Sequence, residues 1–251
     1  MAFEDRRKLA EKVLEVLELT HLADGSTEQD ILTLCERART PFGDVAAVCV
    51  PARFVSLARD ALRGSRVAVA TVANWPRGRS KVDYVAAEAE IAFFEGADEV
   101  NVVLPWRSVK SRDPRTPASM VEECARQPNR KQFIKVTLEA GELDAEELVR
   151  EAARNAMDCG AEFLETATGK TDHRARVEHA RMILEEIRDH RVDGGFKAGH
   201  MDSLDDCRAH LELAAEVMGE DWITPDNFRL GGGTQVLEEV LAVLEKEKTG
   251  A

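Results

Sequence analysis

The segment 160–172, GAEFLETATGKTD, places the glutamate Glu165 at the end of an apolar run that is typical of a buried strand. Three other polar residues stand in similarly apolar surroundings: Asn101 in DEVNVVL, Lys135 in FIKVTLE and Lys197 in GGFKAG. Such side chains are rarely buried without a partner or a function. We therefore take these four residues as the candidate catalytic groups.

These residue types support two kinds of chemistry and one structural alternative. A desolvated lysine beside another cation loses its proton readily and can attack a carbonyl group to form a Schiff base. A carboxylate such as Glu165 opposes that loss, because its charge stabilises the ammonium form of Lys197. Such a pair suits general acid–base catalysis instead. In the structural alternative, the charges form a buried ion-pair network that only holds the interior together.

A glycine-rich stretch near the end of the chain could bind an anion. RLGGGTQ (229–235) precedes a segment of helical period, so backbone N–H groups at the helix start could accept a phosphate-type group. Lys170 and Arg229 would attract such a group, whereas Asp202 in FKAGHMDS (196–203) would repel it. The donors would be Gly231, Gly232, Gly233 and Thr234. A purely structural turn would explain the glycines as well.

Strand-like segments must position these side chains. Eight follow one another, at 16–20, 45–50, 67–73, 98–104, 133–138, 161–166, 192–198 and 228–233. Segments with apolar residues at helical spacing lie between them, for example 81–97, 144–161 and 176–191. This alternation predicts a parallel sheet of the α/β class, and eight strands close a TIM (β/α)8 barrel.

We predict one barrel domain over residues 1–251, with an N-terminal helix before the first strand. An open doubly wound sheet is the alternative, but no strand leads into a Gly-x-Gly-x-x-Gly turn. The stretch 107–120, rich in Pro, Arg and Ser, is predicted to be a long loop after the fourth strand. Active sites of such barrels lie at the carboxyl ends of the strands, where we expect Lys135, Glu165 and Lys197 to share one mouth.

The composition narrows the class of protein further. A net charge of −13 disfavours nucleic acid as a partner, and no apolar run approaches the roughly 18–20 residues that span a bilayer. The N-terminus does not resemble a secretory signal, so we expect a cytoplasmic protein without membrane association. The five cysteines lack Cys-x-x-Cys spacing and His173 and His179 lie six residues apart. We therefore expect neither disulfides, nor a metal site, nor a cofactor.

The motifs together resemble the deoxyribose-phosphate aldolase family across nearly the whole chain. They are LTLCERARTPFGDVAAVCV, RVAVATVANWPRG, GADEVNVVLPWR, FIKVTLEAGEL, GAEFLETATGK, GGFKAG and DWITPDNFRLGGG. Members of that family are class I aldolases, which join acetaldehyde to glyceraldehyde 3-phosphate through a lysine Schiff base. The resemblance implies a TIM barrel, an aldolase-type lyase and a small carbonyl substrate; homodimers are common among such barrels. The residues expected around the substrate are Thr20, Thr168, Gly169, Lys170, Gly199, Gly231, Gly232, Gly233 and Thr234.

The chain departs from the family pattern at the reacting positions. Glu165 stands where the family has its Schiff-base lysine, and Asn101 replaces an aspartate involved in proton transfer. Lys197 matches the second lysine, which in the family lowers the pKa of the nucleophile. The loop after the seventh strand is one residue shorter, with Asp202 near the place of an arginine.

We predict a lyase with a rebuilt site that acts on a small aldehyde or ketone. In it Glu165 would be the acid or base, Asn101 would hydrogen-bond the substrate, and Lys197 would polarise a carbonyl or form a relocated imine. The alternatives are a catalytically silent homologue that binds a ligand or a partner protein, and ordinary aldolase activity through another lysine.

Overall fold

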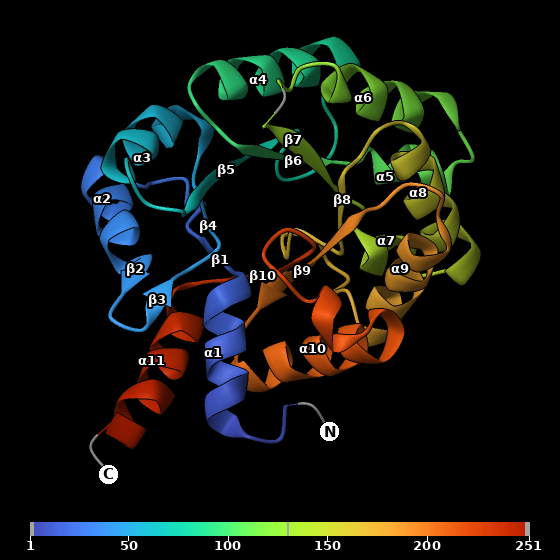
Figure 1. Ribbon diagram of the computed structural model, residues 1–251. Coiled ribbons are helices and arrows are strands. Elements are labelled where there is room, and N and C mark those ends of the chain that lie inside the picture. Colours follow the sequence, from blue (N-terminus) through green and yellow to red (C-terminus); the bar gives the residue numbers. More distant parts are fainter. Residues whose placement is uncertain (1–2, 130, 249–251) are drawn as a thin grey trace.

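The chain forms a closed barrel of eight strands surrounded by helices (Figure 1). A computed structural model describes residues 3–129 and 131–248. The order of strands around the barrel is β1-β10-β9-β8-β7-β6-β5-β4, and every neighbouring pair is parallel. This topology confirms the predicted TIM barrel, and the helix α1 (Arg6–Val16) precedes its first strand as expected.

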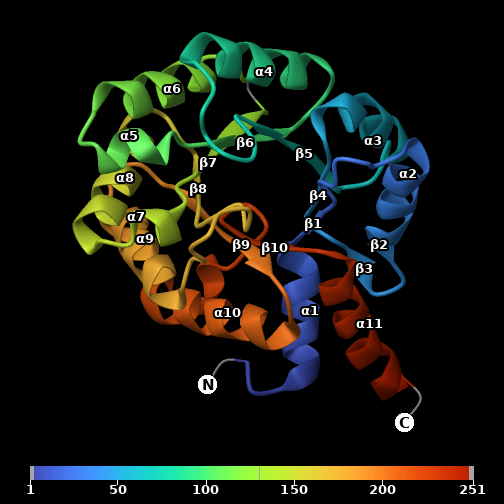
Figure 2. The same ribbon diagram turned by 180° about the vertical axis from the view of Figure 1, so that it is seen from behind.

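In the described chain, eight helices of ten or more residues, α1 among them, carry most of the outer layer, and shorter elements complete it (Figure 2). The barrel strands are β1 (Leu17–Thr20), β4 (Ala47–Cys49), β5 (Ala68–Ala73), β6 (Glu99–Val103), β7 (Phe133–Thr137), β8 (Phe163–Glu165), β9 (Gly195–Met201) and β10 (Phe228–Gly232). The long helices after α1 are α2 (Glu28–Arg37), α4 (Val82–Phe94), α6 (Arg115–Ala125), α8 (Glu146–Asp158), α9 (Val177–Asp189), α10 (Leu204–Met218) and α11 (Thr234–Lys248). The short elements are α3 (Val55–Ala61), α5 (Trp106–Lys110), α7 (Ala140–Leu143), two single 3₁₀ turns (Ala52–Phe54 and Glu220–Trp222) and a small hairpin of β2 (Arg39–Thr40) and β3 (Gly43–Asp44).

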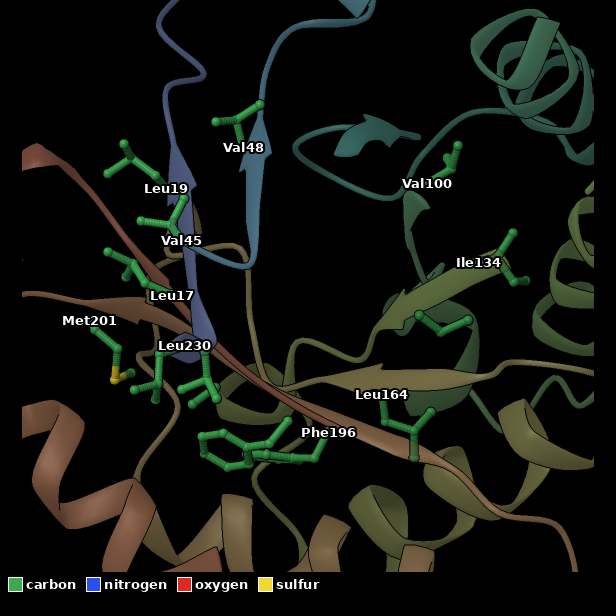
Figure 3. Close-up of a cluster of buried hydrophobic side chains, with 14 of the residues drawn as sticks. Leu17, Leu19, Val45, Val48, Val100, Ile134, Leu164, Phe196, Met201 and Leu230 are labelled. Carbon is green, nitrogen blue, oxygen red and sulfur yellow. The ribbon is translucent and has the colours of Figure 1, made fainter. Parts of the chain in front are cut away.

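The core lies between the strands and the helices. Figure 3 shows part of it, including Leu17, Leu19, Ile134 and Phe196 on barrel strands. Successive side chains of a strand point to opposite faces, so the residues between these apolar ones face the barrel interior. This alternation directs Glu18, which lies between Leu17 and Leu19, and the other polar strand residues inward.

Two predictions about loops and strand ends were wrong. The stretch 107–120 is largely helical: it holds most of α5 and the first half of α6. Helix α6 buries an apolar face at helical spacing, which includes Met120, Val121 and Cys124. Just before the helix, Asp113 accepts a hydrogen bond from the Arg115 N–H group. The seventh barrel strand, β9, continues to Met201, so Lys197 lies inside that strand rather than at its end.

None of the helices in the described chain is long and apolar enough to span a bilayer.

Candidate active site

A cavity of about 320 Å³ opens at the carboxyl ends of the barrel strands. Its wall includes the ends of β1, β4, β8, β9 and β10 and the loops that follow β5 and β8. Of the predicted site residues, those that line it are Thr20, Asn101, Glu165, Thr168, Lys170, Lys197, Gly231, Gly232 and Gly233. Most of the site residues predicted from the sequence therefore line one cavity.

Glu165 lies at the cavity with both carboxylate oxygens hydrogen-bonded. Parallel pairing sets it opposite Lys197 on one side and Thr137 on the other. Lys197 Nζ lies 2.9 Å from Oε1, and the Thr137 hydroxyl donates to Oε2 at 2.5 Å. Glu165 is 6% exposed, so its charge is held by these partners rather than by bulk water.

Lys197 is held between two carboxylates. Its second partner is Glu18 on β1, whose Oε1 lies 2.5 Å from Nζ. Burial alone would lower the pKa of Lys197, but the charges of Glu165 and Glu18 outweigh burial and raise that pKa above its ordinary value. Lys197 is therefore an ammonium ion at neutral pH. A Cβ atom at Gly231 would lie 2.9 Å from Lys197 Cε, so glycine there leaves room for the lysine.

Below the cavity the ion pairs continue through the barrel interior. Lys135 binds both Glu18 and Glu99, and Arg229 binds Glu99 at 3.0 Å. Burial raises the pKa of Glu18, but Lys135 and Lys197 outweigh it and hold that pKa below its ordinary value. The buried line of alternating charges, here called the charge line, comprises Glu165, Lys197, Glu18, Lys135, Glu99 and Arg229, and its three anions balance its three cations.

The charge line corrects two predictions. Lys135 does not share the mouth with Glu165, because it is fully buried beneath Glu18. Arg229 cannot attract an anion to the cavity, since its guanidinium lies toward the amino ends of the strands, against Glu99 at the first residue of β6.

Asn101 lines the cavity with a buried side-chain amide. Its Nδ2 donates to Glu18 Oε1 at 3.3 Å, and because a carboxylate only accepts, the amide orientation is set. Asn101 Oδ1 is buried and has no hydrogen-bond partner among the residues that the structure describes. It is the one atom of this amide that remains for a substrate or a water molecule.

The loop after β8 is held over the cavity by Glu139, a residue that sequence analysis did not identify. Its carboxylate accepts from the Thr168 N–H at 3.1 Å, from the Thr168 hydroxyl, and from the Thr171 hydroxyl at 3.1 Å. Burial raises the pKa of Glu139 despite these hydrogen bonds. The backbone of Glu139 is left-handed, with φ of 54°, at the residue that precedes α7.

Besides Lys135, three predicted site residues lie outside the cavity wall. Gly169 and Gly199 line a neighbouring hollow between the loops after β8 and β9, and Thr234 begins α11 behind Gly233. Gly199 is still needed there, since a Cβ atom would lie 2.1 Å from the Ala167 carbonyl oxygen.

The expected repulsion between Asp202 and an anion is weakened in the structure. The Arg174 guanidinium lies 2.5 Å from the Asp202 carboxylate, so the loop carries a paired charge rather than a free one. Lys170 lines the cavity and is exposed. Among the described residues, no group of three or more His, Cys, Asp and Glu side chains could hold a metal ion.

Glu18 is the main residue that sequence analysis missed. It stands between Leu17 and Leu19, so the criterion that singled out Asn101 and Lys197, a polar residue among apolar neighbours on a strand, also applied to it. Its role depends on contacts with strands that are more than 100 residues away along the chain.

Comparison with known proteins agrees with this architecture. The family model of the DeoC/LacD family aldolases matches residues 15–219. A deoxyribose-phosphate aldolase of Agrobacterium fabrum is 39% identical over 246 residues, which cover 97% of this chain and 95% of that protein. A solved structure from Toxoplasma gondii ME49, named for the same aldolase, superposes with a TM-score of 0.87 at 24% identity and covers 96% of both chains. The aldolase of Aeropyrum pernix superposes with a TM-score of 0.72 at 16% identity, covering 95% of this chain and 98% of that one.

Proposed function

The chain belongs to the DeoC/LacD aldolase family, and on this premise we propose that it is a carbon–carbon lyase whose site is rebuilt around Glu165 and Lys197. The substrate class is a small β-hydroxy aldehyde or ketone, or the two carbonyl compounds from which it forms. The observation that carries the proposal is the 2.9 Å contact between the Glu165 carboxylate and the Lys197 ammonium at the wall of the cavity.

Lys197 supplies the electrophile. An ammonium group has three N–H donors, and Glu18 and Glu165 accept from it in the described structure. The third donor can bind a substrate carbonyl oxygen and stabilise the negative charge that develops there. Asn101 Oδ1 can accept from a substrate hydroxyl.

Glu165 supplies the base. In the cleavage direction it takes the proton of the β-hydroxyl group, a carbonyl forms at that carbon, and the bond between the α and β carbons breaks. The electron pair of that bond becomes an enolate whose oxygen is held by Lys197. Glu165 then returns the proton to the α carbon, so no co-reactant is consumed. Aldol addition is the reverse of these steps.

Schiff-base formation at Lys197 is disfavoured by the same geometry. Attack on a carbonyl needs a neutral amine, whereas two buried carboxylates stabilise the ammonium form of Lys197. Lys170 also lines the cavity, and imine formation at that lysine is the competing mechanism.

The test is solvent exchange of α-protons, which follows the enolate step without knowledge of the full substrate. We expect acetaldehyde, acetone or hydroxyacetone to exchange deuterium in D₂O in the presence of the protein, as followed by proton NMR. Glu165→Gln should slow this exchange by about 100-fold or more. Glu162→Gln is the matched control, because Glu162 lines a cavity at the other end of the barrel.

Borohydride distinguishes the mechanisms. The parent protein should gain no mass when it is reduced in the presence of acetaldehyde. A reduced adduct on Lys197 or Lys170 would replace acid–base cleavage with a relocated imine.

A second candidate is a homologue that binds a ligand without catalysis. It is favoured by the nearly complete internal pairing of Glu165 and Lys197, which are 6% and 3% exposed. Saturable binding of a small carbonyl compound without exchange or adduct would support it.

A further inference from the structure

His200 lies at the edge of the candidate active site in a left-handed backbone conformation. The register between β9 and β10, which lie side by side in Figure 1, shifts between Leu230 and Gly232, where β9 holds one residue more than β10. His200 belongs to this bulge, and its φ is 62°. Bulges beside active sites re-aim side chains, and a left-handed residue other than glycine costs stability. A role for the imidazole ring in binding would account for that cost.

Gly169 on the loop after β8 makes room for the ring. A Cβ atom at Gly169 would lie 2.4 Å from His200 Cγ and 2.6 Å from Nδ1, so the imidazole packs directly on the glycine. His200 lines both the active-site cavity and the neighbouring hollow. Neither of its ring nitrogens is hydrogen-bonded to a residue that the structure describes. The ring is therefore held in place by packing and keeps its hydrogen-bonding capacity.

Asp202, which also lines the cavity, has one carboxylate oxygen to spare beside this ring. Its Oδ2 accepts from Arg174 at 2.5 Å, and Gln235 donates to its carbonyl oxygen at 3.1 Å, so the residue is fixed. Its Oδ1 lies 3.6 Å from His200 Nε2, which is too far for a hydrogen bond. Within the described chain, Oδ1 accepts no hydrogen bond. Nε2 and Oδ1 are thus a neighbouring donor or acceptor and acceptor without a partner.

A hydroxyl group suits this pair of atoms. A hydroxyl oxygen at hydrogen-bond distance from both can donate to Asp202 Oδ1 and accept from an N–H group at His200 Nε2. The separation of 3.6 Å leaves room for such a bridge. A phosphate group suits it less well, because its oxygens are mainly acceptors and its charge repels the Asp202 carboxylate.

Other polar atoms of the cavity wall are acceptors too. The Thr168 hydroxyl donates to Glu139, and the Thr20 hydroxyl donates to the Glu18 carbonyl oxygen at 3.3 Å. Toward a ligand, both hydroxyl oxygens can therefore only accept. Asn101 Oδ1 is a further acceptor. A ligand with several hydroxyl groups can donate to these atoms, whereas a phosphate group cannot.

We propose that His200 and Asp202 bind a hydroxyl group of the substrate and thereby select an uncharged polyhydroxy aldehyde over its phosphate ester. This inference rests on the proposed function, because it names the part of the β-hydroxy carbonyl compound that lies away from Lys197 and Glu165. The reacting carbonyl stays with those two residues, and a hydroxyl group further along the carbon chain reaches the bulge of β9. The sugar 2-deoxyribose has this form.

Binding measured without turnover tests the proposal. The ligands are 2-deoxyribose, its 5-phosphate and 3-hydroxybutanal, which is a β-hydroxy aldehyde without a further hydroxyl group. Titrations followed by saturation-transfer NMR give the Kd of each ligand. We expect deoxyribose to bind about 10-fold more tightly than either of the others, because it alone gains the hydrogen bonds of an uncharged hydroxyl group at the bulge.

His200→Gly separates binding from a structural role. Glycine adopts a positive φ at little cost, so urea denaturation should show a fold at least as stable as that of the parent protein. Deoxyribose binding should nevertheless weaken by about 10-fold, while the Kd of 3-hydroxybutanal stays the same. His173→Ala is the matched control, because His173 lines the neighbouring hollow and not the cavity wall. It should leave all three affinities unchanged.

Asp202→Asn tests the selection against phosphate. It removes the charge that repels a phosphate group, and it releases Arg174 from its ion pair. We expect deoxyribose 5-phosphate to bind about 10-fold more tightly to this variant than to the parent protein.

Several results would overturn the proposal. They are no measurable binding of deoxyribose, equal affinity for deoxyribose and its phosphate, an unchanged deoxyribose Kd in His200→Gly, and an equal loss of 3-hydroxybutanal binding in that variant. The proposed function is judged separately, by α-proton exchange of acetaldehyde, which has no hydroxyl group to bind at the bulge. Exchange together with an unchanged deoxyribose Kd in His200→Gly would refute this inference alone.

Discussion

Glu18→Gln tests whether the stability of the fold depends on equal numbers of anions and cations in the charge line. Glu18 is fully buried and, among the residues that the structure describes, is the one anion that touches both Lys135 and Lys197. The substitution keeps the side-chain shape but leaves three cations against two anions in the barrel interior. Each lysine retains one carboxylate, Glu99 or Glu165.

The expected loss is about 3–5 kcal/mol in the free energy of unfolding, because breaking one member of a buried pair leaves a charge without compensation. Adding Lys135→Met to Glu18→Gln should restore part of the lost free energy of unfolding, because two separate neutral pairs then remain. They are Lys197 with Glu165 and Arg229 with Glu99. We expect the two substitutions to couple favourably by at least about 1 kcal/mol.

Urea denaturation measures these differences, provided that the m-values agree between variants. Glu15→Gln is the matched control, because Glu15 pairs with Lys12 at the surface and should contribute less than about 1 kcal/mol. The pKa of Glu18 is lowered in the fold, so its stabilisation is present above its unfolded pKa of about 4.3 and is lost as the pH falls. Glu18→Gln should therefore reduce the slope of acid unfolding. A double variant that is less stable than Glu18→Gln would refute the charge-balance reasoning.

Three further predictions concern the cavity. Glu165→Lys should give a borohydride-trapped acetaldehyde adduct that the parent protein does not form, because Lys197 then repels the new ammonium group and lowers its pKa. Adding Asn101→Asp should raise aldol turnover further. Trapping of acetaldehyde by the parent protein at Lys197 would contradict this prediction. Deoxyribose 5-phosphate should bind no tighter than about 1 mM by calorimetry, since Arg174 is paired with Asp202 at the cavity and is not free to hold a phosphate. Micromolar affinity would show a working phosphate site. Burial raises the pKa of Glu139, so its ionisation lowers the free energy of unfolding as the pH rises above about 4.3. In urea denaturation, Glu139→Gln should remove this pH-dependent loss of stability. The same pH dependence in the parent and in Glu139→Gln would contradict the prediction.

The sequence by itself determined the barrel and most of the cavity wall. Strand periodicity, helical spacing and the number of strands suffice for the fold, because each is a local pattern that repeats along the chain. The same alternation brought Glu165, Lys197 and Asn101 to one site, since polar residues among apolar neighbours on barrel strands must face inward. The predicted loop at 107–120 failed because its prolines and arginines concealed the apolar face of α6.

Only the tertiary structure decided which charges meet. Glu18 and Lys197 are 179 residues apart, and their contact depends on barrel closure through β1 and β10. No local pattern could separate Lys135, which lies beneath Glu18, from Lys197, which reaches the cavity, because both stand at inward positions and differ only in depth. The raised pKa of Lys197 also depends on barrel closure. An ammonium between two carboxylates keeps its proton, and the second carboxylate is supplied by the first strand of the barrel.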